Sequence, residues 1–117
     1  MTALAGIRVL DLSRVLAGPL CAQLLADNGA EVIKIEAPRG DENRRWPPLA
    51  NGESPNFHSV NRGKKFVALD LKSEEGVRIV HEIAKTCDIV VSNYLPARAR
   101  ALRIDFDTNH QIGRAHV

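Results

Sequence analysis

The stretch that decides the predicted fold is Gly6-Ile7-Arg8-Val9-Leu10-Asp11-Leu12. A glycine is followed here by a short run of β-branched and leucine side chains, and this pattern predicts a buried strand over 7–12. A loop at 13–18 comes next. Pro19 then suits the first turn of a helix, where its missing N–H leaves no hydrogen bond unmade, and Gly29 suits the end of that helix. The segment therefore predicts a strand, a turn and a helix.

Three more strands and a second long helix follow from the same kind of pattern. The further strands are expected at 31–36, 66–70 and 88–92. Ser73 is placed to cap the second helix, and the spacing of its apolar residues gives it one buried face, made of Val77, Val80, Ile83 and Ala84. In the first helix the expected core stripe is Leu20, Leu24 and Leu25. Strands that alternate with helices predict an α/β fold with a Rossmann-like parallel sheet, which we expect to be incomplete in this chain.

Length and composition limit the possible classes of protein. The 117 residues suffice for one modest core, and 44% apolar with 26% charged residues is ordinary globular usage. A formal charge of +2 does not predict a nucleic-acid partner. No basic leader and no apolar run of about 20 residues is present, so we expect a cytoplasmic or organelle-matrix protein without a membrane partner. Cys21 and Cys87 form no Cys-x-x-Cys pair, which favours reduced, buried thiols over a metal site.

Basic residues gather after the predicted strands. In an open parallel sheet, ligands bind outside the carboxyl ends of the strands, which here are followed by the segments 13–18, 37–45, 70–72 and 93–100. Those segments contain Arg14, Arg39, Arg44, Arg45, Lys72, Arg98 and Arg100. One edge of the sheet should therefore be positively charged. Such an edge suits a polyphosphate ligand, such as a nucleotide or coenzyme A (CoA), although solvated surface charges are the simpler alternative.

A nicotinamide dinucleotide site is the main competing hypothesis, because Glu36 ends the second strand as an acidic residue does in such sites. The turn after the first strand, Ser13 to Pro19, has one glycine and then a proline without an N–H, where a dinucleotide turn needs three spaced glycines. No phosphate-binding loop of the Gly-x-x-x-x-Gly-Lys-Ser/Thr type is present. The histidines also lack metal-ligand spacing; they are His58, His81, His110 and His116.

Several blocks, taken in order, resemble the N-terminal part of class III CoA-transferases, a family that includes formyl-CoA transferase, carnitine CoA-transferase and α-methylacyl-CoA racemase. The resemblance extends from about Leu4 to Thr108. The blocks are 4–13, 15–19, 25–36, 40–41, 61–65, 69–72 and 88–91. Two departures from the family pattern are Ala37, where many relatives have a basic residue, and the segment 93–97.

The resemblance implies an enzyme that moves CoA between an acyl-CoA thioester and a free carboxylic acid, on an interlocked homodimer. It implies no permanently bound cofactor, since CoA and acyl-CoA are substrates. By position, the residues that would contact CoA are Val15, Leu16, Ala17, Arg39, Leu69, Asp70, Leu71, Lys72, Asn93 and Tyr94. The nucleophilic aspartate of the family lies downstream of these blocks, so no catalytic residue is assigned and the 117-residue chain alone is expected to be inactive.

The resemblance also predicts how the chain is divided. Residues 1–111 are expected to be the N-terminal part of the large CoA-transferase domain. Residues 112–117 are expected to be a non-native tail, because 109–117 has no helical or alternating periodicity and the last six residues correspond to a common sequencing-adapter string. Three alternatives remain at this point: an acyl-CoA racemase of the same family, a non-catalytic nucleotide- or anion-binding module, and a nucleic-acid contact through Asn61–Lys65.

Overall fold

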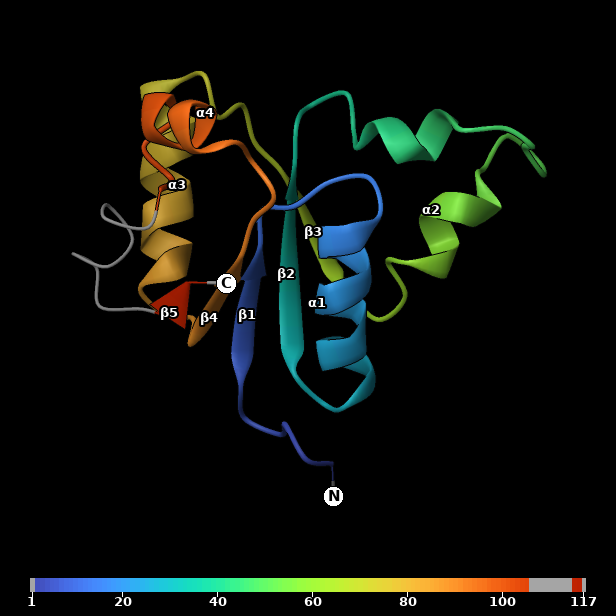
Figure 1. Ribbon diagram of the computed structural model, residues 1–117, viewed down its shortest axis with the longest axis horizontal. Coiled ribbons are helices and arrows are strands. Elements are labelled where there is room, and N and C mark those ends of the chain that lie inside the picture. Colours follow the sequence, from blue (N-terminus) through green and yellow to red (C-terminus); the bar gives the residue numbers. More distant parts are fainter. Residues whose placement is uncertain (1, 106–114, 117) are drawn as a thin grey trace.

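The computed structural model describes residues 2–105 and the backbone of Ala115–His116 (Figure 1). Within these residues the sheet has five strands in the order β3-β2-β1-β4-β5, and every neighbouring pair is parallel. The strands are β1 (Arg8–Asp11), β2 (Glu31–Glu36), β3 (Lys65–Ala68), β4 (Ile89–Val91) and β5 (Ala115–His116). The helices are α1 (Ala17–Asp27), η1 (Glu42–Arg45), α2 (Pro55–Ser59), α3 (Glu74–Ala84) and α4 (Pro96–Ala101). The predicted α/β fold with a Rossmann-like parallel sheet is confirmed.

Apolar side chains cover both faces of the sheet. Figure 1 shows α1 on one side of the strands and α3 with α4 on the other. Val9 and Val32, which are register partners, pack toward Ala22 of α1. The next pair along the strands, Leu10 and Ile33, packs toward α3 and α4. Successive side chains of a strand point to opposite faces, so these central strands are buried on both sides, as expected of a parallel sheet between two helical layers.

The helix α1 begins two residues before Pro19 and buries a different face from the one expected. Leu20 is 41% exposed and Leu24 is 53% exposed, so the prediction that they belong to the core stripe is wrong. Ala22 and Gln23 are buried in their place. The small Ala22 side chain allows the helix to lie close to the sheet, and the Gln23 Oε1 accepts a hydrogen bond of 2.8 Å from the Arg62 N–H. Leu25 is partly buried, as expected of a residue at the edge of the core.

The helix α3 follows the prediction closely. The Ser73 Oγ accepts a hydrogen bond of 3.0 Å from the Gly76 N–H, which satisfies one of the free donors at the start of the helix. Val77, Val80 and Ala84 are buried and Ile83 packs against the core. The strands β1 and β4 are each one residue shorter than predicted at both ends, while β3 begins one residue earlier and ends two residues earlier than predicted.

The long segment between β2 and β3 contains two short helices that were not predicted. The 3-10 helix η1 begins after Asp41, whose side chain accepts the Asn43 N–H at 3.0 Å. Further along, α2 leads into the turn before β3. In the described part of the chain, no helix is long and apolar enough to cross a membrane. Of the two cysteines, Cys87 is buried as predicted, whereas Cys21 is only half-buried.

The predicted boundary between residues 1–111 and a non-native tail at 112–117 stays a prediction. Most of this tail lies outside the described residues, and only the backbone of Ala115–His116 is placed, beside β4. The strand β5 was not expected from the sequence. His110 and the side chain of His116 also lie outside the described residues.

Candidate functional site

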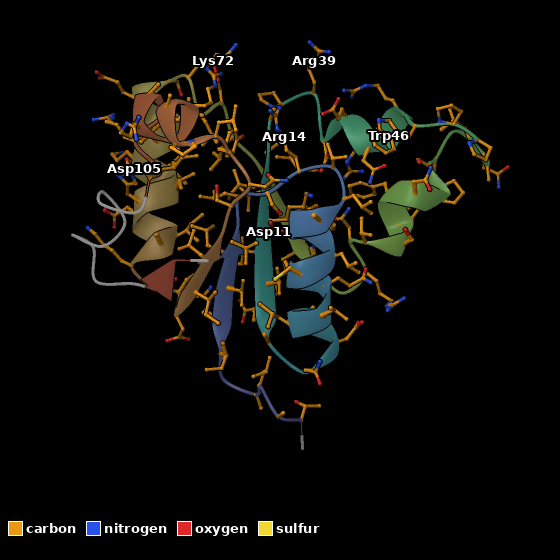
Figure 2. All side chains as sticks on the ribbon, viewed as in Figure 1. Asp11, Arg14, Arg39, Trp46, Lys72 and Asp105 are labelled. Carbon is orange, nitrogen blue, oxygen red and sulfur yellow. The ribbon has the colours of Figure 1, made fainter. Side chains whose placement is uncertain are left out.

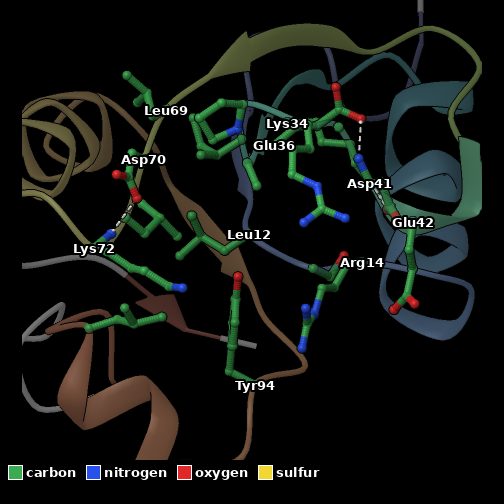
Figure 3. Close-up of a pocket in the computed structure, with 18 of the residues that line it drawn as sticks. Leu12, Arg14, Lys34, Glu36, Asp41, Glu42, Leu69, Asp70, Lys72 and Tyr94 are labelled. Atoms are coloured by element: carbon green, nitrogen blue, oxygen red, sulfur yellow. Dashed lines mark hydrogen bonds and ion pairs between the residues drawn. The ribbon is translucent and has the colours of Figure 1, made fainter.

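A cavity of about 620 Å³ lies at the carboxyl ends of the strands (Figure 3). Its wall is formed by the end of β2 and by the segments that follow β1, β2, β3 and β4, together with Arg98 of α4 and Leu102 directly after that helix. The lining residues fall at 12–14, 34–42, 45, 69–72, 94, 98 and 102. Figure 2 shows Arg14, Arg39 and Lys72 at the same end of the molecule, although they are far apart in the sequence. The expected ligand edge of the sheet is therefore hollow and carries basic side chains.

Five of the seven predicted basic residues line the cavity. They are Arg14, Arg39, Arg45, Lys72 and Arg98. Within residues 2–105, none of these five forms an ion pair. Two of the four lining carboxylates, Glu36 and Asp41, are each held by another basic residue. The cavity therefore has a surplus of positive charge available to an anion.

Arg44 is the basic residue whose role differs most from the prediction. Its guanidinium donates to both carboxylate oxygens of Glu36, at 2.9 and 3.0 Å, and lies 3.9 Å from the centre of the Phe57 ring. This bidentate and stacked arrangement holds η1 against the end of β2. Arg44 thus stabilises the segment beside the cavity and does not line the cavity itself. Arg100 does not line it either.

Two buried ion pairs lie beside the cavity. Lys34 Nζ lies 2.9 Å from Asp41 Oδ2, and each side chain is 1% exposed. Lys64 Nζ lies 2.8 Å from Asp11 Oδ2, and it also donates to the Pro19 carbonyl and to Asn61 Oδ1, each at 2.9 Å. Burying such charges is costly unless their hydrogen bonds are made, and here they are.

Burial and neighbouring charges shift the pKa of two of these groups. For Lys64, burial lowers the pKa and the nearby Asp11 carboxylate acts to raise it, and the pKa of Lys64 is lower than usual as a result. For Asp41, burial acts to raise the pKa, but hydrogen bonds from the Asn43 N–H and the Lys34 ammonium act in the opposite direction. The pKa of Asp41 is lower than usual as a result. Asp41 is therefore a fixed anion at neutral pH.

Side chains from three other segments hold the turn at 13–15. Ser13 donates its N–H to Asp11 Oδ1 at 2.9 Å, and its hydroxyl bonds the same oxygen. The Asn93 side chain binds both the N–H and the carbonyl of Arg14. For Val15, Asp41 accepts the N–H and Asn43 donates to the carbonyl. Val15 has a φ of 74°, in the left-handed region that a β-branched residue seldom adopts.

The structure brings six of the ten predicted contact residues to the cavity. Those that line it are Arg39, Leu69, Asp70, Leu71, Lys72 and Tyr94. Those that do not are Val15, Leu16, Ala17 and Asn93. Leu16 is 54% exposed and directly precedes α1, which begins at Ala17. The Tyr94 ring lies beneath the Arg14 guanidinium, 5.2 Å from ring centre to Cζ.

The structural roles of Lys34 and Asp41 at the site were not predicted from the sequence. Lys34 lies in β2, which is buried on both faces, so its ammonium group needs a buried partner, and the predicted strand at 31–36 did not identify one. Asp41, directly after Gly40, is an Asx residue at the start of a short helix, and that signal was available from the sequence. In the part of the chain that is described, no cluster of three or more His, Cys, Asp or Glu side chains forms a metal site.

Residues 4–114 match the sequence pattern of CoA-transferase family III. The chain belongs to this family. It is 50% identical over 109 residues to mouse (Mus musculus) succinyl-CoA:glutarate CoA-transferase, an alignment that covers 92% of this chain and 25% of the mouse protein. It is 48% identical over 99 residues to succinate--glutarate CoA-transferase of Agrobacterium fabrum, an alignment that covers 78% of this chain and 25% of that protein.

A solved structure of the same family agrees in fold. A CAIB/BAIF family protein from Brucella suis superposes with a TM-score of 0.89 at 36% identity, over 95% of this chain and 31% of that one. This member of CoA-transferase family III thus spans about a quarter of the length of the curated relatives it matches.

Proposed function

We propose that this chain is the CoA-binding part of an enzyme that moves CoA from an acyl-CoA thioester to a free carboxylic acid. The observation that carries the proposal is the cavity with five basic side chains that form no ion pair within residues 2–105. CoA carries a pyrophosphate and a further phosphate group. Arginine offers a planar fork that binds phosphate oxygens bidentately, so a cluster of this kind suits such a ligand.

The proposed contacts divide by chemistry. Arg39 and Lys72 would hold phosphate groups, while Leu69 and Leu71 offer apolar surface to the pantetheine arm. Tyr94 presents an aromatic ring to the same space. The other residues of the proposed site are Val15, Leu16, Ala17, Asp70 and Asn93. We assign no catalytic residue within the chain.

The names of the relatives support a substrate class. Succinyl-CoA:glutarate CoA-transferase acts, as its name states, between two dicarboxylic acids. We therefore propose a dicarboxylic acyl-CoA donor and a dicarboxylic acid acceptor. In this proposal an aspartate outside the 117 residues is the nucleophile, and covalent catalysis divides one difficult exchange into two easier steps. The chain alone is then expected to bind CoA without turnover.

The interlocked homodimer and the cytoplasmic location stay predictions. A partner surface would account for the apolar side chains that α1 leaves exposed, namely Leu20 and Leu24. These two residues are four positions apart, so they lie on one face of the helix.

The proposal is tested by calorimetric titration of CoA into the 117-residue chain. Arg39→Gln should weaken CoA binding by roughly tenfold, since it removes a charged hydrogen-bond donor. The matched control is Arg78→Gln, because Arg78 is an exposed arginine on α3 that pairs with Glu75 and lies outside this cavity. The control should bind CoA as the unchanged chain does. Equal affinity for NAD, or an equal loss in both variants, would contradict the proposal.

A further inference from the structure

The turn at 13–15 is held by side chains, although a turn of this length could be held by its own backbone. We propose that Asn93 and Asp41 are positioning residues, which fix this turn so that the Arg14 side chain faces the cavity. The side chains of both residues act on the turn and do not contact the ligand, so Asn93 belongs to the proposed site only through its effect on the turn. The inference rests on the proposed function in one respect, because it takes Arg14 as a residue that meets the anionic ligand.

Asn93 uses both ends of its amide on one residue. Its Oδ1 accepts the Arg14 N–H at 3.2 Å, and its Nδ2 donates to the Arg14 carbonyl at 2.8 Å. The adjacent Tyr94 lies under the Arg14 guanidinium. One short segment after β4 therefore holds both the backbone and the side chain of Arg14. Figure 3 shows Arg14 and Tyr94 side by side at the wall of the cavity.

Asp41 holds the next residue, Val15. The Val15 N–H lies 3.1 Å from Asp41 Oδ2, and the Val15 carbonyl accepts a hydrogen bond of 2.8 Å from Asn43 Nδ2. Lys34 in turn fixes the carboxylate from the side of β2. A β-branched residue with positive φ persists only where its surroundings determine it, and these contacts do so.

The carboxylate of Asp41 has no capacity left for a ligand. Oδ1 accepts the Asn43 N–H at 3.0 Å, and Oδ2 accepts from Lys34 and from Val15. An anionic ligand would in any case be repelled by this charge. Asp41 must therefore affect ligand binding through the turn, which it holds in place before the ligand binds. A group held in its bound position in advance loses less entropy on binding.

The first test compares Asn93→Ala with Asn28→Ala in the 117-residue chain. Asn28 is a matched control, because it is also exposed and its Nδ2 donates to a backbone carbonyl, that of Leu24, at 2.7 Å. Amide hydrogen exchange at Arg14 should rise roughly tenfold in Asn93→Ala and stay unchanged in Asn28→Ala. Equally fast exchange at Arg14 in the unchanged chain and in Asn93→Ala would overturn the proposal, whether or not CoA binds.

The second test separates positioning from direct contact by a double-mutant cycle with CoA as the probe. Arg14→Gln and Asn93→Ala should each weaken binding, by roughly tenfold or less, and the double variant should be no weaker than Arg14→Gln alone. Additive losses would mean that Asn93 meets the ligand itself, which overturns the proposal. Failure of CoA to bind the unchanged chain would contradict the proposed function, and hydrogen exchange at Arg14 would still decide the role of Asn93.

A rescue experiment tests the role assigned to the Asp41 side of the turn. Asn43→Ala should weaken CoA binding, and adding Val15→Gly should restore most of it, because glycine adopts positive φ without the contacts that valine needs. Hydrogen exchange at residue 15 gives the same comparison without CoA. The proposal is overturned if Val15→Gly fails to offset Asn43→Ala in both measurements.

Discussion

Lys64 Nζ lies 2.8 Å from Asp11 Oδ2, and neither side chain is exposed to solvent at all. The pair joins the end of β1 to the turn before β3, two segments more than fifty residues apart in the chain. Asp11 also binds Ser13, so the same carboxylate fixes the beginning of the turn beside the cavity. The stability of the core and the shape of the proposed site are thereby linked.

Removal of Lys64 should be strongly destabilising. Lys64→Ala leaves a buried Asp11 carboxylate without its partner, which costs about 3–5 kcal/mol of the free energy of unfolding. Lys65→Ala is the matched control, because Lys65 is adjacent, 72% exposed in its side chain, and should change stability by less than about 1 kcal/mol. Urea unfolding of the two variants gives the comparison. Similar losses in both would contradict the role of the buried pair.

The stability of the chain should fall in acid in part because of Asp41. Its pKa in the folded protein is below the usual value of about 3.9, so the unfolded chain takes up a proton first as the pH falls. The stabilisation is fully present above the unfolded pKa and is lost as the pH drops through the folded one. Carbon NMR titration of the Asp41 carboxyl checks this directly. A midpoint above about 4 would contradict the assigned environment.

Adjacent arginines should respond differently to the same substitution. Arg45→Gln should weaken CoA binding by up to roughly tenfold and leave stability unchanged, because Arg45 lines the cavity without an ion pair within residues 2–105. Arg44→Gln should instead lower the free energy of unfolding by about 1–3 kcal/mol, because it removes a bidentate contact to Glu36. Thermal unfolding and calorimetric titration of both variants make the test. A reversed pattern would refute the division of roles.

Gly18 should tolerate no side chain while Ser13 is present. A Cβ at position 18 would lie 2.2 Å from the Ser13 Cβ, far inside van der Waals contact. Gly18→Ala should therefore cost about 1–3 kcal/mol of stability. In a Ser13→Gly variant the opposing atoms are absent. Adding Gly18→Ala to that variant should therefore cost less stability than Gly18→Ala costs in the unchanged chain. Additive losses in the double variant, measured by urea unfolding, would show that the clash is not the cause.

The sequence predicted those parts of the fold that depend on local pattern. The apolar run before Asp11 and the Ser73 cap with its buried Val77 and Val80 are features of single segments, and both are confirmed. The burial of α1 was predicted less well. Which face of that helix meets the sheet depends on how closely Ala22 can approach, and its exposed leucines resemble a core stripe in the sequence.

The candidate site was predicted in its position more than in its detail. The carboxyl ends of parallel strands lie at the same edge of the sheet. Arg39, Lys72 and Tyr94 could therefore be placed at this edge from the predicted strands alone. The pairing of Lys34 with Asp41 could not be predicted from the sequence, because it depends on how the segment after β2 folds back. The two hydrogen bonds from Asn93 to the Arg14 backbone also could not be predicted, because they depend on how two loops meet.

Chemical-shift mapping measures directly whether the cavity at the strand ends binds CoA. CoA is titrated into the isotopically labelled 117-residue chain, with NAD as the comparison ligand. We expect the amides of Arg14, Arg39, Lys72 and Tyr94 to shift first and NAD to cause smaller changes. Shifts confined to Asn61–Lys65, or equal shifts with NAD, would contradict it.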